Sequence, residues 1–75
     1  MRYHLLYEAE INGKRVSGER VVVTDDDLEG AARTIARESG ATSIFVKKRF
    51  WSNRPAKDAD IINKTFLLHE ESRDD

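Results

Sequence analysis

Apolar and polar residues alternate along the first eleven positions of the chain. The odd-numbered positions of this stretch are apolar: Tyr3, Leu5, Tyr7, Ala9 and Ile11. The even positions are mostly polar, and this alternation predicts a strand with one buried face. Asn12-Gly13 follows at once, and this pair suits the positive φ angles of a two-residue type I′ turn. Because residues 14–24 are again rich in β-branched side chains, we expect the two runs to form a hairpin.

A two-residue turn fixes how the two strands pair. In that register Arg20 falls on the buried face, whereas Val21 and Val23 point to solvent. One extra residue in the second strand would reverse this arrangement, and glycine tolerates the conformation that such a bulge requires. We therefore predict a β-bulge at Ser17-Gly18 that turns Val21 and Val23 toward the core.

A helix is predicted between Thr24 and Gly40. Thr24 is expected to be the N-cap, and the three aspartates at 25–27 fill the first turn, where carboxylates meet the positive end of the helix dipole. Gly40 supplies a left-handed stop. The apolar residues at helical spacing are Leu28, Ala31, Ala32 and Ile35. Because this stripe is narrow and rich in alanine, the helix should approach its neighbours closely.

Two more β-prone runs, Thr42–Phe50 and Ile61–His69, complete the fold. The element order predicts an α+β domain of two layers, β-β-α-β-β, with an antiparallel four-stranded sheet in the order 2-1-3-4 and one helix packed on one face. This single domain is expected to span residues 1–69, and an acidic flexible tail is expected at 70–75.

The second face of such a sheet stays open to water. The residues expected there are His4, Leu6, Glu8, Glu10, Phe45, Lys47 and Arg49. Leu6 and Phe45 are the apolar exceptions on this face. Ile44, Val46 and Phe50 are expected to point the other way, into the core.

Composition limits the class of protein. The chain has 75 residues, of which 39% are hydrophobic and 36% charged, and this argues for a small folded core rather than disorder. The absence of cysteine excludes disulfide scaffolds, thiolate zinc sites, iron-sulfur clusters and thiol catalysis. No apolar run approaches the roughly 20 residues of a membrane span. We expect a soluble cytoplasmic protein without a membrane partner, located in the host cytoplasm if a phage encodes it.

No arrangement of residues in the sequence indicates catalysis. His4 and His69 lack the spacing of metal ligands, and the start of the helix explains the aspartates at 25–27. The serines and glycines form no nucleophile elbow and no phosphate-binding loop. We therefore expect no enzymatic activity, no cofactor and no bound metal.

Charge is distributed unevenly, although the formal net charge is only −1. Residues 42–57 carry five cations and no acid, so the rest of the chain carries −6. The first candidate binding residues are those of this basic and aromatic stretch: Phe45, Lys47, Lys48, Arg49, Trp51, Arg54 and Lys57. Glu8 and Glu10 are a second candidate, since carboxylates on a rigid sheet can compete with phosphates for a basic groove. Both sets are also compatible with surface charges that keep a small sheet soluble.

The order of the elements resembles a known group of proteins. A hairpin leads through Val21-Val22-Val23-Thr24 into the alanine-rich helix, and Ile44-Phe45-Val46 and a final strand follow. This arrangement resembles several small phage-encoded anti-CRISPR inhibitors over residues 1–69, in size and element order. The resemblance implies a non-enzymatic inhibitor that binds a CRISPR effector, often on a surface that contacts nucleic acid. It assigns no role to any single residue.

The leading hypothesis is a non-catalytic protein-protein interaction module with Trp51 as its anchor. As a phage or mobile-element inhibitor, it would bind a larger host protein or ribonucleoprotein complex that handles nucleic acid. The alternative is a small nucleic-acid-binding protein that uses the basic and aromatic segment 47–57, with Trp51 or Phe45 as a stacking platform. A homodimer through edge strands, or through Leu6 and Phe45 on the open faces, is compatible with either hypothesis.

Overall fold

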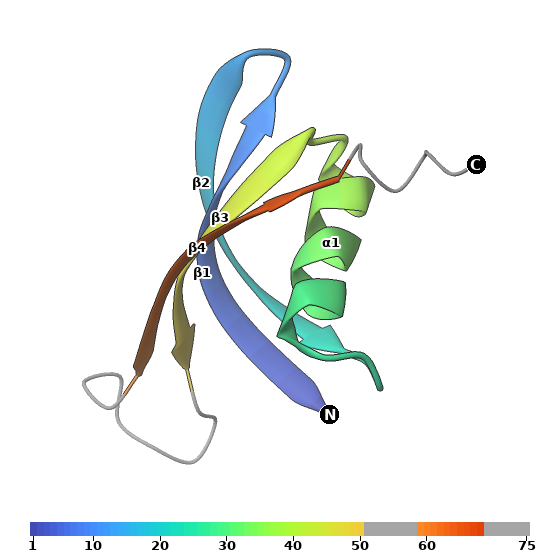
Figure 1. The fold of residues 1–75 in the computed structure, drawn as a ribbon, viewed down its shortest axis with the longest axis vertical. Coiled ribbons are helices and arrows are strands. Elements are labelled where there is room, and N and C mark those ends of the chain that lie inside the picture. The colour runs from blue at the N-terminus through green and yellow to red at the C-terminus, as the bar shows by residue number, and fades with distance from the viewer. Residues whose placement is uncertain (51–58, 69–75) are drawn as a thin grey trace.

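The structure, a computed structural model, describes residues 1–50 and 59–68. The elements in chain order are β1 (Arg2–Ile11), β2 (Lys14–Val23), α1 (Leu28–Ser39), β3 (Ser43–Phe50) and β4 (Asp60–Leu67). The four strands form one antiparallel sheet in the order β2-β1-β3-β4 (Figure 1). The predicted fold class and strand order are confirmed. The expected tail at 70–75 lies outside the described residues, so the domain limit stays a prediction.

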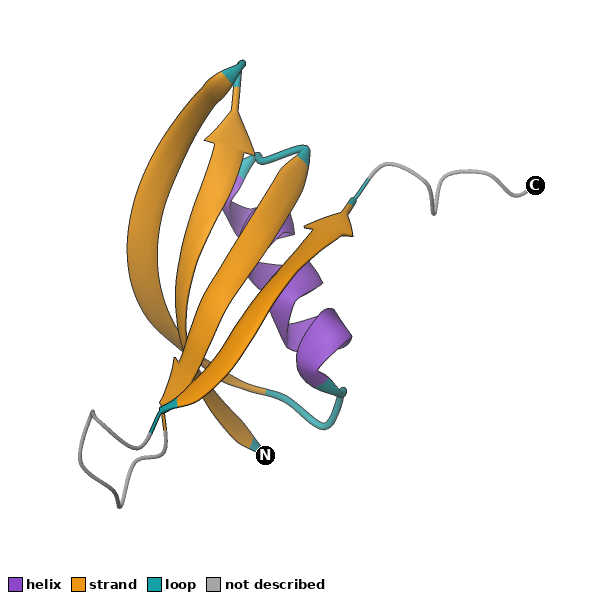
Figure 2. Cartoon of the chain, turned by 60° about the vertical axis from the view of Figure 1, so that its left-hand side comes forward, coloured by secondary structure: helices purple, strands orange, loops and turns teal. Residues whose placement is uncertain are grey.

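Helix α1 covers one face of the sheet, called the helix face below, and none of the described residues covers the opposite, open face (Figure 2). The buried apolar side chains are Tyr3, Leu5, Ala9, Val22, Ala31, Ala32, Ile35, Ala36, Ala41, Ile44, Val46 and Phe66. Five of these twelve are alanines, three of them on α1, as the narrow helical stripe predicts. The core is therefore thin, and Leu5 and Ile35 are among its largest fully buried side chains.

The β1–β2 hairpin has the predicted turn. Asn12 and Gly13 both adopt positive φ angles, 53° and 79°, as a type I′ turn requires. Tyr7 lies opposite Gly18, in the register that this turn dictates. The pairing continues without a shift to the end of β2, so the predicted bulge at Ser17-Gly18 is wrong.

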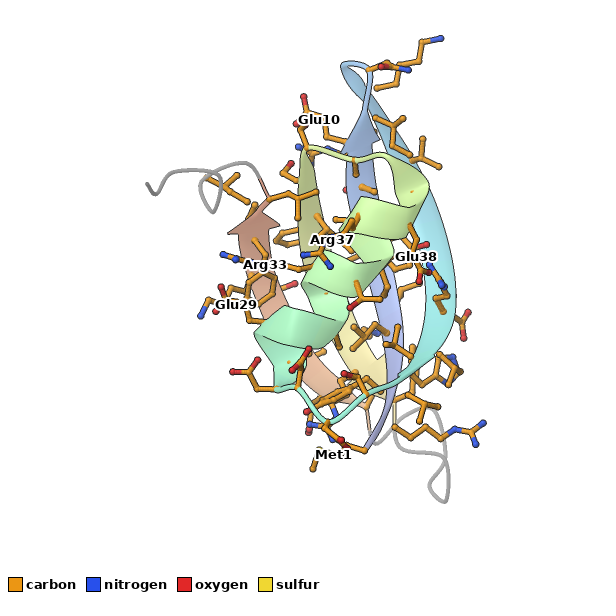
Figure 3. The ribbon with its side chains drawn as sticks, turned by 90° about the vertical axis from the view of Figure 1, so that its right-hand side faces the viewer. Met1, Glu10, Glu29, Arg33, Arg37 and Glu38 are labelled. Carbon is orange, nitrogen blue, oxygen red and sulfur yellow. The ribbon has the colours of Figure 1, made fainter. Side chains whose placement is uncertain are left out.

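Arg20 explains why no bulge is needed. It lies opposite Leu5 on the helix face, but β2 is an edge strand, and the Arg20 guanidinium forms an ion pair with Glu38. Glu38 lies on α1, where Figure 3 labels it. A long charged side chain can lie at the margin of a core when its head group reaches solvent and a partner. Val22 is buried opposite Tyr3, so β2 still contributes one valine to the core.

Helix α1 begins later than predicted. Asp27 is the N-cap, because its backbone is extended and its carboxylate accepts a hydrogen bond from the Gly30 amide at 3.0 Å. Thr24, the predicted N-cap, instead accepts a hydrogen bond from the Asp26 amide at 3.1 Å, and its own amide still belongs to the sheet ladder. The helix ends at Gly40 with a φ of 74°, as predicted.

Strand β3 contains an irregularity that the residue pattern does not reveal. Its register against β1 shifts between Leu6 and Tyr7, so Lys47 is an extra residue in β3. A compensating shift in the pairing of β3 with β4 lies beside Asn63, whose φ is 48°. A bulge of this kind reverses the alternation of side chains beyond it.

Beyond the bulge, the two faces of β3 are exchanged. Arg49, which was expected on the open face, lies opposite Leu5 on the helix face, with its guanidinium 4.7 Å from the centre of the Tyr3 ring. Phe50, which was expected in the core, lies opposite His4 on the open face. Both expectations are wrong for the same reason, because the alternation was extended through a bulge that the sequence does not signal.

Candidate protein-binding face

Side chains from all four strands form rows across the open face, because residues directly opposite each other in an antiparallel pair share a face. The first row consists of Val21, His4 and Phe50. The second row consists of Glu19, Leu6, Lys48 and Ile61. The third row consists of Ser17, Glu8, Phe45 and Thr65. The face therefore changes from mainly apolar near the start of β1 to mainly polar near the hairpin turn.

The apolar end of the open face is defined by five side chains: Leu6, Val21, Val23, Phe50 and Ile61. Val23 is 75% exposed and Ile61 is 62% exposed, whereas Leu6 and Phe50 are half-buried by their neighbours. The His4 ring lies among them, with its centre 5.0 Å from that of Phe50. Single exposed apolar residues are ordinary, but a cluster from all four strands is typical of a surface that binds another molecule.

Two polar groups border the apolar end. Nε2 of His4 lies 2.5 Å from Oε2 of Glu19, so this carboxylate already has a partner within the chain. Lys48 lies between Leu6 and Ile61 in its row, is exposed, and forms no ion pair in the part of the chain that the structure describes. A complementary surface would therefore combine an apolar centre with a carboxylate opposite Lys48.

The polar end of the open face centres on Glu8. Its carboxylate accepts a hydrogen bond from Nζ of Lys47 at 3.0 Å and one from Nη1 of Arg15 at 3.4 Å. The hydrogen bond from Lys47 is the main cause that lowers the pKa of Glu8 below its ordinary value of 4.5; desolvation opposes it, and the charge of Lys47 and the contact with Arg15 add to the lowering. Glu10 accepts a hydrogen bond from Ser43 at 3.4 Å. The charges of this end are thus largely satisfied by one another.

The structure brings five of the nine candidate residues of the sequence to one face and places one on the other. Phe45, Lys47 and Lys48 lie on the open face, as do Glu8 and Glu10. The Lys47 charge is paired with Glu8. The remaining candidates of the basic and aromatic stretch are Arg49, which lies on the helix face, and three residues outside the described part of the chain: Trp51, Arg54 and Lys57.

Four residues of the apolar end were not predicted to lie on a binding face: Val21, Val23, Phe50 and Ile61. The turn register alone, used without the added bulge, would have placed Val21 and Val23 correctly. Phe50 lies beyond the irregularity in β3, for which the sequence gives no signal. Ile61 keeps the alternation of β4 counted from the buried Phe66, so the two-residue period of this strand alone would have placed it on the open face.

The described residues contain no group of three or more His, Cys, Asp or Glu side chains placed to hold a metal ion, and they enclose no pocket. No helix among them is long and apolar enough to cross a membrane. Comparisons of the chain with protein-family models, with curated proteins and with solved structures give no significant match.

Proposed function

We propose that this chain is a non-catalytic protein-binding module that docks its partner on the apolar end of the open face. The observation that carries the proposal is the gathering of Val21, Val23, Phe50, Ile61 and Leu6 on the side of the sheet that α1 leaves uncovered. The partner surface would be apolar at its centre, with an acidic group opposite Lys48.

The charges of the open face support a protein rather than a nucleic acid as the partner. A nucleic-acid platform needs cations that are available to phosphate, together with aromatic faces for stacking. Here Lys47 and Arg15 are bound to Glu8, and Glu10 and Glu19 add negative charge to the same face. Nucleic-acid binding by segment 47–57, the alternative function, has less support from these charges, and a titration with nucleic acid tests it.

The resemblance in element order to anti-CRISPR inhibitors names one class of partner to test, a CRISPR effector complex. Other large complexes that handle nucleic acid belong to the same test, provided that their surface offers an apolar patch with a neighbouring carboxylate. The proposal itself concerns the surface, and it holds for any protein partner that buries the apolar end.

A matched pair of variants tests the surface. Val21 and Val16 lie on the same strand with similar exposure, 41% and 47%, but Val21 points to the open face and Val16 to the helix face. Tagged wild type, Val21→Asp and Val16→Asp would be used to capture proteins from cells that carry the gene, and each would also be titrated against purified CRISPR effector complexes.

We expect wild type and Val16→Asp to bind the partner with equal affinity. Val21→Asp should bind it more than about tenfold more weakly, because burying a charge in an apolar interface costs free energy. Equal capture by Val21→Asp would contradict the proposal. Labelled DNA and RNA are titrated in parallel. If wild type binds them saturably at physiological salt and Lys48→Glu abolishes this binding, the nucleic-acid function would replace the protein-binding proposal.

A further inference from the structure

Strand β2 forms one edge of the sheet along its whole length. No described strand pairs with its outer side, and it lies at the margin of the sheet in Figure 2. It has ten residues, contains no proline, and pairs with β1 without any register shift. Edge strands usually carry a bulge, a proline or a short length that prevents pairing with another chain. Strand β2 therefore has no bulge, proline or shortened length to block pairing, and its protection is limited to its charged side chains, Lys14, Arg15, Glu19 and Arg20.

The hairpin turn determines which backbone groups of β2 point outward. In a two-residue hairpin, the residue after the turn forms a hydrogen-bonded pair with its partner, and such pairs then recur at every second residue. The hydrogen bond of 2.9 Å from the Thr24 amide to the Met1 carbonyl agrees with this pattern, because Thr24 is an even-numbered residue like Lys14 after the turn. The even residues of β2 therefore bond inward to β1. The residues with outward N–H and C=O groups are Arg15, Ser17, Glu19, Val21 and Val23.

We propose that a second copy of this chain pairs with the outer edge of β2, antiparallel and about a two-fold axis at Ser17. In this register Arg15 lies directly opposite Glu19 of the second copy, and the symmetry forms the same pair again on the other side of the axis. Both residues point to the open face, so each pair joins opposite charges across neighbouring strands. Within one chain Arg15 also contacts Glu8 and Glu19 also contacts His4, so each pair between the copies extends an existing charge contact.

The same register matches side chains on the helix face. Val16, which is 47% exposed in the single chain, comes beside Gly18 of the second copy. The ring of Tyr7 covers that glycine, with its hydroxyl only 2.5 Å from where a Cβ would lie. Val16 therefore gains an aromatic neighbour. The register also places Lys14 opposite Arg20 of the second copy, where the ion pair between Arg20 and Glu38 offsets the like charge.

Neighbouring registers fit less well. An axis at Gly18 places Arg15 opposite Val21 and Ser17 opposite Glu19, which forms no pair of opposite charges. An axis at Glu19 places two Glu19 carboxylates against each other. Of these three positions, the axis at Ser17 alone forms two pairs of opposite charge.

The dimer would be a continuous sheet of eight strands with both helices on one side. Because the axis is perpendicular to the sheet, the two open faces would lie together on the other side. This inference uses the edge of β2 and not the open face, so it goes beyond the proposed function and does not depend on it.

Sedimentation equilibrium of the full chain tests the dimer, with circular dichroism as the check of folding. We expect wild type to approach twice 8.6 kDa as concentration rises. Ser17→Pro removes an outward N–H at the axis while leaving the β1–β2 bonds intact, and we expect a folded monomer. If wild type stays monomeric at every protein concentration measured, the proposal is overturned.

A mixing experiment tests the register even if the proline variant fails to fold. Arg15→Glu makes both positions acidic, and Glu19→Arg makes both basic, so each variant alone should dimerise more weakly than wild type. Their mixture should form a heterodimer about tenfold or more tighter than either homodimer. No preference for the mixed species would overturn the register.

The two proposals fail separately. Val21→Asp should lose the protein partner and keep the dimer, whereas Val16→Asp should keep the partner and weaken the dimer. A dimer that Val21→Asp dissociates and that Ser17→Pro leaves intact would be a contact between open faces, and it would overturn pairing through β2.

Discussion

The absence of a side chain at Gly18 leaves room for the Tyr7 ring on the helix face, at the edge of the sheet. The Tyr7 ring lies over it, and a Cβ at Gly18 would come within 2.6 Å of the ring carbon that bears the hydroxyl. Glycine is usually unfavourable within a strand. If the Tyr7 ring did not lie over this position, a change of Gly18 to alanine would therefore stabilise the strand. We expect Gly18→Ala to lower the free energy of unfolding by about 1–3 kcal/mol, measured by urea denaturation.

A double-mutant cycle separates this contact from any effect on backbone conformation. With Tyr7→Ala in place, the ring is gone, and Gly18→Ala should then be neutral or slightly stabilising. An equal loss of stability in both backgrounds would show that the Tyr7 ring is not the cause.

Glu8 connects the polar end of the open face to pH. The hydrogen bond from Lys47 lowers its pKa, so the folded state binds this proton more weakly than the unfolded chain does. The resulting stabilisation is present above about pH 4.5, the ordinary value, and is lost as pH falls through the lower folded pKa. We expect thermal unfolding of wild type to lose more stability between neutral and acidic pH than that of Glu8→Gln.

Glu10→Gln is the matched control for this measurement. Glu10 lies on the same strand and face, and its carboxylate accepts a hydrogen bond from Ser43 in place of an ammonium group. If Glu8→Gln and Glu10→Gln have the same pH profile, the bond from Lys47 has no specific effect. Added salt should reduce the difference, because the groups are partly exposed.

At the scale of elements, the start of α1 separates two residues that both carry capping side chains. The Asp27 carboxylate accepts a hydrogen bond from the Gly30 amide in the first turn, whereas the Thr24 hydroxyl oxygen accepts one from the Asp26 amide before the helix begins. We expect Asp27→Ala to lower the free energy of unfolding by about 1 kcal/mol and Thr24→Ala to lower it by less. Chemical denaturation of the two variants checks the order, and a larger loss for Thr24→Ala would place the cap at the predicted residue.

The sequence predicts correctly those features of the fold that depend on a few neighbouring residues. Asn12-Gly13 determines both the turn and the register of the hairpin, and Gly40 determines the end of the helix. The error at the helix start has a clear physical origin, since threonine and aspartate are both good N-caps. The choice between them depends on where β2 stops pairing with β1, and this is a tertiary property.

The candidate face was harder to predict because its residues were judged by hydrophobicity. Hydrophobicity favours an inward position for Val21 and Val23, which the unbroken register of β2 does not allow. Phe50 was expected inward by simple alternation, but Lys47 interrupts that alternation. In both strands the register, rather than apolar character, decides which face a side chain occupies. The apolar residues that seemed misplaced therefore form the surface to which we assign function.

At the scale of the whole molecule, the two faces of the sheet divide the apolar side chains between folding and binding. The core packs side chains such as Leu5 and Ile44 against the alanines of α1, while exposed ones such as Val23 and Ile61 lie on the other face. A chain of this size has little stability to spare, about 4–11 kcal/mol by the usual range per residue. Apolar residues that stay exposed add little to this stability, so their gathering on one face is explained by binding rather than by folding.

This division predicts that the apolar end can be made polar without harm to the fold. We expect the triple variant Val21→Thr, Val23→Thr, Ile61→Thr to keep its free energy of unfolding within about 0.5 kcal/mol per site, because these side chains are exposed. It should also bind less of a hydrophobic dye. Val22→Thr is the matched control, since Val22 is 7% exposed on the helix face and a buried hydroxyl there should cost about 1–3 kcal/mol. If the triple variant were destabilised per site as much as Val22→Thr, the apolar end would belong to the packing of the chain itself and would not be available to a partner.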